Sequence, residues 1–373
     1  MNRVSIRPSA AAIWAGAGCT AYPHRVAESS EEGMDKSAAE EGTAAHWVAE
    51  NMLATQGAEL SDYVGNPAPN GVMVTDEMAQ CVEVYTDYVE SLVMAPRQQW
   101  NVEQKVSVFK GVTGTVDFWT YNHDSQILDV IDYKHGFRSV EPFKNWQLAL
   151  YGAGILRALH DIDGHTPLKV RLTIVQPRAY ASGGPIRTWE TTPSELVAMM
   201  AQATVRAAEV HSNPIARSSS ECRYCPARHA CPAALDAGIQ LYEAATAAMP
   251  YDLEMGEMAV QYDILQRAHE QLGFLIAAYE SKIKNALYAG GKVPGYSLQE
   301  KKGREEWAVS VEEVQALGAI FNVDLCPPSP MTPKQAMAKK VIDIDVIKQY
   351  TKQDSKGHDL VAVNTINAQR IFS

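Results

Sequence analysis

Two acidic residues and a lysine lie on neighbouring segments that have strand-like patterns. Asp117 is the last residue of the run Gly-Thr-Val-Asp. Asp132 and Lys134 come later in the chain and are separated from each other by one residue. Because side chains alternate along a strand, Asp132 and Lys134 are expected on the same face. Two carboxylates can hold Mg²⁺ or Mn²⁺, and a lysine beside that ion can orient or activate a water. These residues therefore predict metal-assisted hydrolysis of a phosphodiester.

An Asp-x-Lys triplet on an exposed strand is common, so the surrounding residues matter. Gln147 and Tyr151 lie four residues apart in a predicted helix and share a face, where they can hydrogen-bond the lysine, a water or a phosphate. His46 and the carbonyl of Tyr133 are further candidate metal ligands, although a lone helical histidine is more often a core or surface residue. Glu103 is a secondary candidate, because a solvent-facing strand residue is the simpler interpretation.

A second group of potential ligands is formed by cysteines. The chain has six, and Cys222, Cys225 and Cys231 lie within ten residues of one another. In a reducing cytoplasm such clusters are typical of metal or cluster ligands rather than disulfides. Cys19 is the best candidate for a fourth ligand, because the small residues before it allow close approach. Four thiolates suit Zn²⁺ or a [4Fe–4S] cluster. Structural zinc usually shows two close pairs, so one distant cysteine plus three favours iron–sulfur.

The elements that must position these residues follow from hydrophobic periodicity and turn signals. A loop is expected over residues 28–41, and the core should contain helices, three antiparallel-looking strands, a helix and further strands. The expected helices are 41–55, 75–95, 142–160 and 193–210, and the expected strands are 102–108, 112–121, 126–133, 170–176 and 187–190. This order predicts an α/β core with a mixed central sheet flanked by helices.

Beyond this core we expect a cysteine-bearing segment over 218–235, long helices over 236–248 and 253–289, and a mostly helical C-terminal extension. The extension should contain a strand-like stretch over 296–307, a helix near 310–318, and a helix that starts at Thr332 with proline at its first position. The expected division is a core over 1–235, a helical segment over 236–291 and an extension over 292–373, whose role is not assigned and for which DNA binding and partner binding are the two candidates.

Charge and hydropathy limit the class of protein. The net charge of −11 argues against a uniformly basic nucleic-acid coat, but residues 166–189 hold four basic and no acidic side chains. Residues 282–304 hold six basic side chains and one acidic. Such stretches either track a phosphate backbone or form solvated faces. The chain has no run of eighteen apolar residues and no apolar leader segment, so we expect a cytoplasmic protein without a membrane span.

The candidate residues occur in an order that resembles the PD-(D/E)XK nuclease superfamily, in its RecB/Cas4-like branch. The matching positions are His46, Asp117, Asp132, Lys134, Gln147 and Tyr151. The resemblance implies a restriction-endonuclease-like core and a DNA substrate. It also implies that His46 and both aspartates bind the divalent metals, that Lys134 serves catalysis, and that the Gln/Tyr pair places the nucleic acid.

The cysteine arrangement is similar to that of the iron–sulfur nucleases of the same branch, in which a cluster links the two ends of the core. Short matches outside the core look like phage- and prophage-encoded members. This implies a DNA exonuclease that acts in recombination or repair in a bacterial host, and a homo-oligomer is among its candidate partners. The alternative is a nucleic-acid-binding recombination scaffold with weak or no nuclease activity, whose extension docks a single-strand annealing protein.

Overall fold

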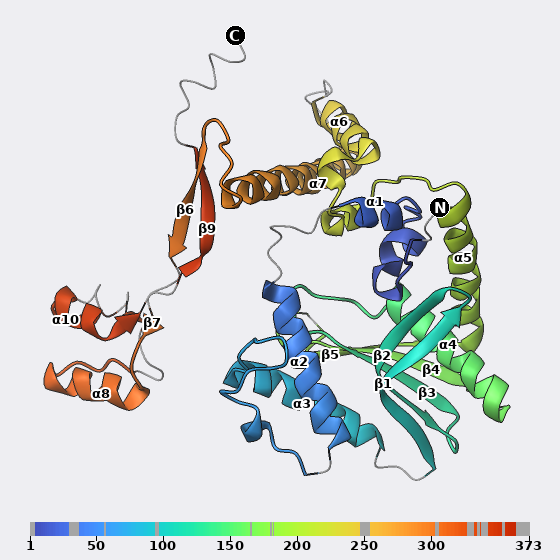
Figure 1. Cartoon of the computed structure of the whole chain (residues 1–373), viewed down its shortest axis with the longest axis horizontal. Helices are drawn as coiled ribbons and strands as arrows, with labels where there is room; N and C mark the ends of the chain where they lie inside the picture. The colour runs from blue at the N-terminus through green and yellow to red at the C-terminus, as the bar shows by residue number, and fades with distance from the viewer. Residues whose placement is uncertain are drawn as a thin grey trace. The chain divides into compact units, whose positions relative to one another are not determined.

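The computed structural model describes residues 4–29, 37–55, 57–93, 97–164, 166–179, 181, 183–246, 254–302, 306–326, 332–333, 336, 342–352 and 355–362. These residues form two compact units, Met1–Tyr279 and Glu280–Ser373. Each unit has its own sheet or sheets and its own apolar core (Figure 1).

A five-stranded mixed sheet is the centre of the first unit. Its spatial order is β1 to β5, with bounds β1 Gln98–Phe109, β2 Val112–Asn122, β3 Ile127–Tyr133, β4 Lys169–Val175 and β5 Ile186–Thr191. The pairs β1–β2, β2–β3 and β4–β5 are antiparallel, and β3–β4 is parallel. A parallel pair needs a long crossover, which α4 (Trp146–Asp163) supplies. The predicted α/β core with a mixed sheet is confirmed.

Helices cover both faces of this sheet (Figure 1). On one face, α2 (Ser37–Ala54) and α3 (Asp76–Val93) bury apolar residues against Phe118, Ile131 and Tyr133. On the other, α4 and α5 (Pro193–Ser212) pack against Leu128 and Leu172. The alternation of strand residues between the two faces produces these two cores. Helix α2 begins four residues before the expected start at 41, so residues 37–41 of the predicted loop are helical, while residues 30–36 of that loop lie outside the described residues.

The chain's N-terminal turns lie beside the segment that carries the late cysteines. The N-terminal elements are η1 (Pro8–Ala10), η2 (Ala12–Gly16) and α1 (Tyr22–Glu28), and the later ones are η4 (Ser220–Tyr224), η5 (Arg228–Ala230), α6 (Pro232–Thr246) and α7 (Met255–Tyr288). Two hydrogen bonds join the segments: Ala21 N to Ile215 O at 3.1 Å, and Ile215 N to Thr20 Oγ1 at 2.8 Å. Residues nearly two hundred positions apart in the sequence are thereby brought together.

The second unit is less helical than the extension was expected to be. Strand β6 (Tyr296–Lys302) pairs with β9 (Ser355–Ala362), and β7 (Glu306–Trp307) pairs with β8 (Thr351–Lys352). Helices α8 (Val311–Ile320) and α10 (Ile344–Gln349) share a small apolar core. The expected helix starting at Thr332 lies largely outside the described residues. Strands β6 and β7 lie within the strand-like stretch expected over 296–307, but their partners β8 and β9 were not predicted, because pairing with a strand about fifty residues away is not visible in periodicity within a short window.

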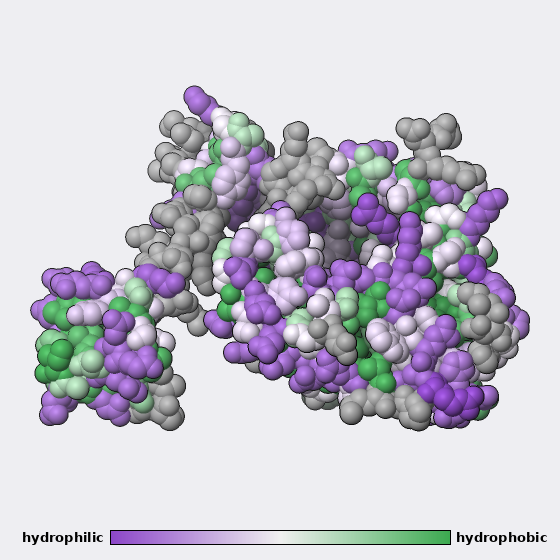
Figure 2. Space-filling model, turned by 60° about the horizontal axis from the view of Figure 1, so that its bottom comes forward, coloured by the Kyte–Doolittle hydropathy of each residue, from purple (hydrophilic) through white to green (hydrophobic). Residues whose placement is uncertain are grey.

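Figure 2 shows polar side chains over much of the visible face, with smaller apolar areas between them. No helix in the described ranges is both long enough and apolar enough to cross a membrane.

Candidate active site

The first feature of the site is a fork between β2 and β3. The two strands pair from Asn122 and Ile127 as far as Phe118 and Ile131, and their register ends there. Asp117 lies just beyond this last pair, and its Oδ2 accepts a hydrogen bond of 2.7 Å from the backbone N–H of Tyr133. Buried backbone donors require a partner, and the carboxylate takes the place of the missing strand. The fork therefore holds the Asp117 side chain in one position.

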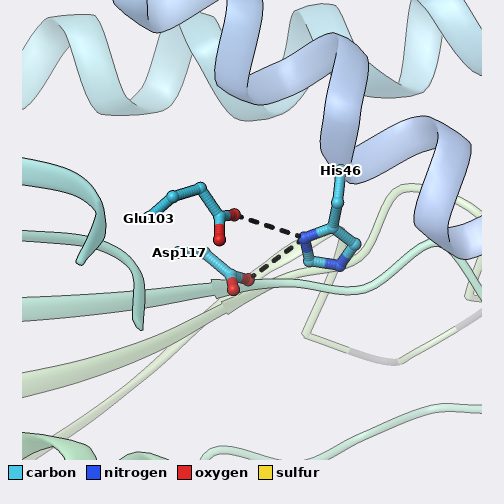
Figure 3. Close-up of side chains that lie close together, drawn as sticks. All are labelled: His46, Glu103 and Asp117. Atoms are coloured by element: carbon cyan, nitrogen blue, oxygen red, sulfur yellow. Dashed lines mark ion pairs between the residues drawn. The ribbon is translucent and has the colours of Figure 1, made fainter. Parts of the chain in front are cut away.

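A set of three metal-ligating side chains meets at this fork. Figure 3 shows His46 from α2, Glu103 from β1 and Asp117 from β2 pointing toward one another. The Nδ1 atom of His46 lies 3.9 Å from Glu103 Oε1 and 3.7 Å from Asp117 Oδ2. One ligand atom from each of the three lies within 4.8 Å of the others. Carboxylate oxygens with one imidazole nitrogen fit a divalent cation such as Mn²⁺ or Mg²⁺.

Glu103 enters this set through an irregularity in β1. Val102 pairs with Phe118 and Gln104 with Val116, so Glu103 falls opposite Asp117 on the same face. The φ angle of Glu103 is 46°, in the left-handed region that non-glycine residues rarely occupy. Such strain persists only where the surroundings impose it, and it is frequent at functional sites. We had expected Glu103 to be a secondary, solvent-facing residue, but the structure places it among the potential ligands.

Asp132 makes a different set of contacts from Asp117. Its Oδ1 accepts a hydrogen bond of 2.9 Å from Gln147 Nε2, and its Oδ2 lies 2.7 Å from Lys134 Nζ. The lysine also donates to Gln147 Oε1 at 3.4 Å, which closes a triangle of side chains. Apart from this ion pair with Lys134, the buried Oδ2 has no hydrogen-bond partner among the described residues. Asp132 therefore remains a possible ligand, although it is not one of the three convergent residues.

Burial and neighbouring charges alter the acidity of the groups at the fork. Burial raises the pKa of Asp117 to about 7, although the charge of His46 opposes this change. Burial alone would lower the pKa of His46, but Asp117 and Glu103 outweigh it and the pKa is raised. Burial likewise opposes charge on Lys134, but Asp132 and Asp117 raise its pKa above the ordinary value. Clustered carboxylates in a buried site favour binding of a cation, which offsets their mutual repulsion.

Gln147 and Tyr151 are positioned by the first turns of α4. Asn145 caps this helix and accepts a hydrogen bond from the N–H of Leu148 at 3.2 Å. Tyr151 packs on Gly114, where a Cβ atom would lie 2.6 Å from the tyrosine ring. The glycine of the Gly-Thr-Val-Asp run is therefore required by the close approach of Tyr151. Burial raises the pKa of Tyr151 above its ordinary value, so its hydroxyl stays protonated and can donate a hydrogen bond.

A polar network behind the site connects α2 to the end of β3, and no pattern in the sequence predicts it. Arg178 lies 3.0 Å from Glu41 and 3.1 Å from Glu77, and it donates to the carbonyl of His135. The buried imidazole of His135 is 3.0 Å from the hydroxyl of Tyr133. Burial, together with the charge of Arg178, lowers the pKa of His135 to about 4. Because Glu41 lies in the same helix as His46, this network helps to fix the position of His46 relative to the sheet.

The four cysteines predicted as ligands surround one small cavity. Cys19 comes from the turn before α1, Cys222 and Cys225 from η4 and its end, and Cys231 from the position between η5 and α6. Burial raises the pKa of Cys225 to about 11, and the other three thiols add to this effect. No three of the four sulfurs belong to a group of ligand atoms within 4.8 Å of one another, in contrast to the fork. The structure thus brings Cys19 together with the three later cysteines, but the four sulfurs are more widely spaced than the ligand atoms at the fork.

Two comparisons with other proteins bear on the chain. The crystal structure of a protein described as a putative exonuclease from Eubacterium rectale is similar at 12% identity, with a TM-score of 0.36, over 69% of this chain and 93% of that one. The model of a family described as a protein of unknown function, DUF2800, matches residues 5–350. The match includes the fork, the cysteine cavity and part of the second unit, and the chain therefore belongs to the DUF2800 family.

Proposed function

We propose that this protein is a divalent-metal-dependent deoxyribonuclease with a PD-(D/E)XK-like core. The observation that carries the proposal is the fork, where His46, Glu103 and Asp117 converge beside the pair Asp132 and Lys134. A buried acidic group with a lysine at its edge is the equipment that phosphodiester hydrolysis requires. The resemblance of the residue order to nucleases, together with this geometry, supports DNA as the substrate.

The residues of the chain have separate roles in this proposal. His46, Glu103 and Asp117 would hold Mg²⁺ or Mn²⁺, with Asp132 and the carbonyl of Tyr133 as additional oxygen donors. The bound cation supplies Lewis-acid stabilisation of charge on the phosphoryl oxygens. The protonated Lys134 stabilises developing negative charge and orients the attacking water, because its pKa is raised.

Gln147 and Tyr151 then position the substrate. Gln147 holds both Asp132 and Lys134, which keeps the lysine aimed at the fork. The hydroxyl of Tyr151 is a neutral donor that can hydrogen-bond a phosphate oxygen. Groups held in place before the substrate arrives reduce the reorganisation needed in the transition state.

The cysteine cavity is proposed to hold a [4Fe–4S] cluster through Cys19, Cys222, Cys225 and Cys231. Structural zinc sites usually show two close pairs of ligands, whereas here one distant cysteine joins three that lie close together in the sequence, and this spacing supports the iron–sulfur cluster over zinc. A cluster there would link the N-terminal turns to the segment after α5. Absorption near 400 nm by anaerobically purified protein, or zinc found by elemental analysis, distinguishes the two.

Exonuclease activity is tested with linear and covalently closed circular DNA of the same sequence. We expect degradation of the linear DNA that requires Mg²⁺ or Mn²⁺ and is abolished by EDTA. Lys134→Ala should reduce the rate by about a hundredfold or more, because a group acting directly on the transition state is lost. Full activity in that variant would refute the assignment. Equal cleavage of the circular DNA would show an endonuclease instead.

A further inference from the structure

A cleft of about 730 Å³ opens beside the proposed catalytic residues. Lys134 and Gln147 line it, so the cleft borders the triangle of Asp132, Lys134 and Gln147 beside the fork. Its walls come from three parts of the first unit: the turns near Ser9 and Ile13, the segment from Arg138 to Gln147, and residues 221–224 in the cysteine-bearing segment. We propose that this cleft binds single-stranded DNA and delivers its backbone to the fork. The inference rests on the proposed nuclease function and specifies its substrate.

Charge in the cleft differs in sign from that of the whole chain. Four basic and two acidic side chains line it, a surplus of two positive charges in a protein whose net charge is −11. One of the acids, Glu141, already accepts a hydrogen bond from Ser139 and lies 3.8 Å from Arg187. Among the described residues, the exposed Arg138 and Lys144 form no ion pair with a carboxylate. Their charges are therefore available to phosphates.

Exposed aromatic rings accompany these cations. Phe143 is 65% exposed and Tyr224 is 53% exposed, although rings of this size are usually buried. Phe143 is held edge-on against Trp189 with ring centroids 5.6 Å apart, and the Arg138 guanidinium lies 5.5 Å from the Tyr224 ring. Both rings therefore lie at the cleft beside a cation, because Lys144 Nζ is 5.4 Å from the centroid of the Phe143 ring, and both residues remain more than half exposed.

Cations beside exposed aromatic rings favour binding of unpaired nucleotides over binding of a duplex. Aromatic side chains bind single strands by stacking on base faces, while lysine and arginine follow the backbone. In a duplex the base faces are covered by neighbouring bases, so Phe143 and Tyr224 would have nothing to stack on. A protein ligand with acidic side chains would satisfy Arg138 and Lys144 but would not explain both rings.

The backbone at Lys144 adds an independent observation. Its φ angle is 50°, so Lys144, like Glu103 at the fork, adopts the left-handed region without being glycine. This conformation is unfavourable for a residue with a side chain, and it tends to persist at ligand sites. Here it places Phe143 and Lys144 at the cleft immediately before the cap of α4.

The cleft also gives the cysteine segment a role in substrate binding. Tyr224 lies between Cys222 and Cys225, so the loop that supplies two thiols also supplies one wall of the cleft. Occupation of the cysteine cavity would fix that wall. Loss of the cysteine-bound cofactor should weaken strand binding even when the fork retains its cation.

The test measures binding of a fluorescently labelled oligothymidylate of about ten nucleotides by anisotropy, in EDTA so that no cleavage occurs. Phe143→Ala and Tyr224→Ala should each weaken binding about fivefold or more, because a stacking surface is lost. The double variant Arg138→Ala/Lys144→Ala should also weaken binding. The slope of log K against the logarithm of the salt concentration should become less negative by about one. Tyr224→Phe keeps the ring and should bind like the wild type.

Matched controls lie away from the cleft. Lys110→Ala removes an exposed lysine at the β1–β2 turn, and Tyr262→Ala removes a tyrosine that is 60% exposed on α7. Both should leave binding unchanged, and circular dichroism should show that all variants are folded. Unchanged binding in every cleft variant would overturn the inference. Equal affinity for the corresponding duplex, or equally effective competition by polyglutamate, would also overturn it.

Cleavage is measured separately, so the two proposals fail in distinguishable ways. Metal-dependent cleavage of DNA with normal binding in the cleft variants would retain the nuclease and reject the cleft. Loss of strand binding in those variants, with no cleavage of any DNA by the wild type, would retain the cleft and reject the nuclease.

Discussion

The fork and the cysteine cavity are both candidate ligand sites, but they are built in opposite ways. At the fork, His46, Glu103 and Asp117 project from two strands and a helix, and their ligand atoms already lie within 4.8 Å of one another. At the cavity, four thiols come from turns and helix ends at distant places in the sequence, and they do not converge as closely. Regular elements fix side chains without a ligand, whereas short turns depend on the ligand to hold them. The fork should therefore survive loss of its cation, but the cavity should not survive loss of its cofactor.

The largest effect is expected for Asp117→Asn, which tests the fork alone. The amide oxygen can still accept the hydrogen bond from Tyr133, but the negative charge is lost. We expect cleavage to fall by about a thousandfold or more, as for loss of a residue that holds the catalytic ion. Thermal unfolding without metal near pH 8 should show no loss of stability, because the pKa of about 7 indicates that burial penalises the carboxylate. A large loss of stability would show that the carboxylate charge supports the fold.

A smaller effect, but on stability, is expected for Cys222→Ser. The serine cannot replace a thiolate ligand, so the segment that holds the N-terminal turns loses its link. The midpoint of thermal unfolding should fall by about 5–15 °C in cofactor-loaded protein. Cys81→Ser, in α3 and away from the cavity, is the matched control and should change the midpoint much less. Equal changes in both variants would contradict the distinction between the two sites.

Arg178→Ala should weaken the fork without removing any ligand. The substitution releases Glu41 and Glu77, so α2 is less firmly tied to the sheet and His46 is less well placed. Metal affinity, measured by calorimetry with Mn²⁺, should fall about ten- to a hundredfold, as for other residues that orient ligands. Arg97→Ala removes an exposed ion pair with Asp124 and should leave the affinity unchanged. An unaltered affinity in Arg178→Ala would show that the helix is held by its apolar face alone.

The smallest effect is a dependence of metal affinity on pH. Asp117, with a pKa of about 7, carries a proton below that pH and must release it to bind a cation. The raised pKa of His46 acts in the same direction. Between about pH 8 and pH 6 the Mn²⁺ affinity should therefore fall, by up to about tenfold for each pH unit and each proton displaced. Affinity that is independent of pH in this range would show that another group dominates binding.

Much of the core was predictable because its signals are local. The helices and strands from α2 to α5 match their hydrophobic patterns closely, and the position of Asp117, Asp132 and Lys134 follows from strand alternation. The role of Glu103 was not predictable. A tight turn with Phe109 opposite Val112 would set Gln104 against Asp117, with Glu103 on the other face. An irregularity between Ser107 and Phe109 shifts the register by one residue and brings Glu103 to the fork.

The network around Arg178 and the cleft were beyond sequence analysis for a different reason. Arg178 contacts partners about forty and one hundred residues away, and no spacing rule connects them. The cleft combines three separate segments whose proximity depends on the packing of the N-terminal turns. Short-range patterns specify elements, but they do not specify which loops meet.

The register shift in β1 also limits which insertions and deletions members of this family can tolerate. Glu103 faces Asp117 only because of the number of residues between it and the β1–β2 turn. A deletion or insertion of one residue there could leave the hairpin intact while turning Glu103 to the opposite face. The length of this hairpin should therefore be as strongly constrained in functional relatives as the identity of its acidic residues, even though nothing in the turn itself touches the site.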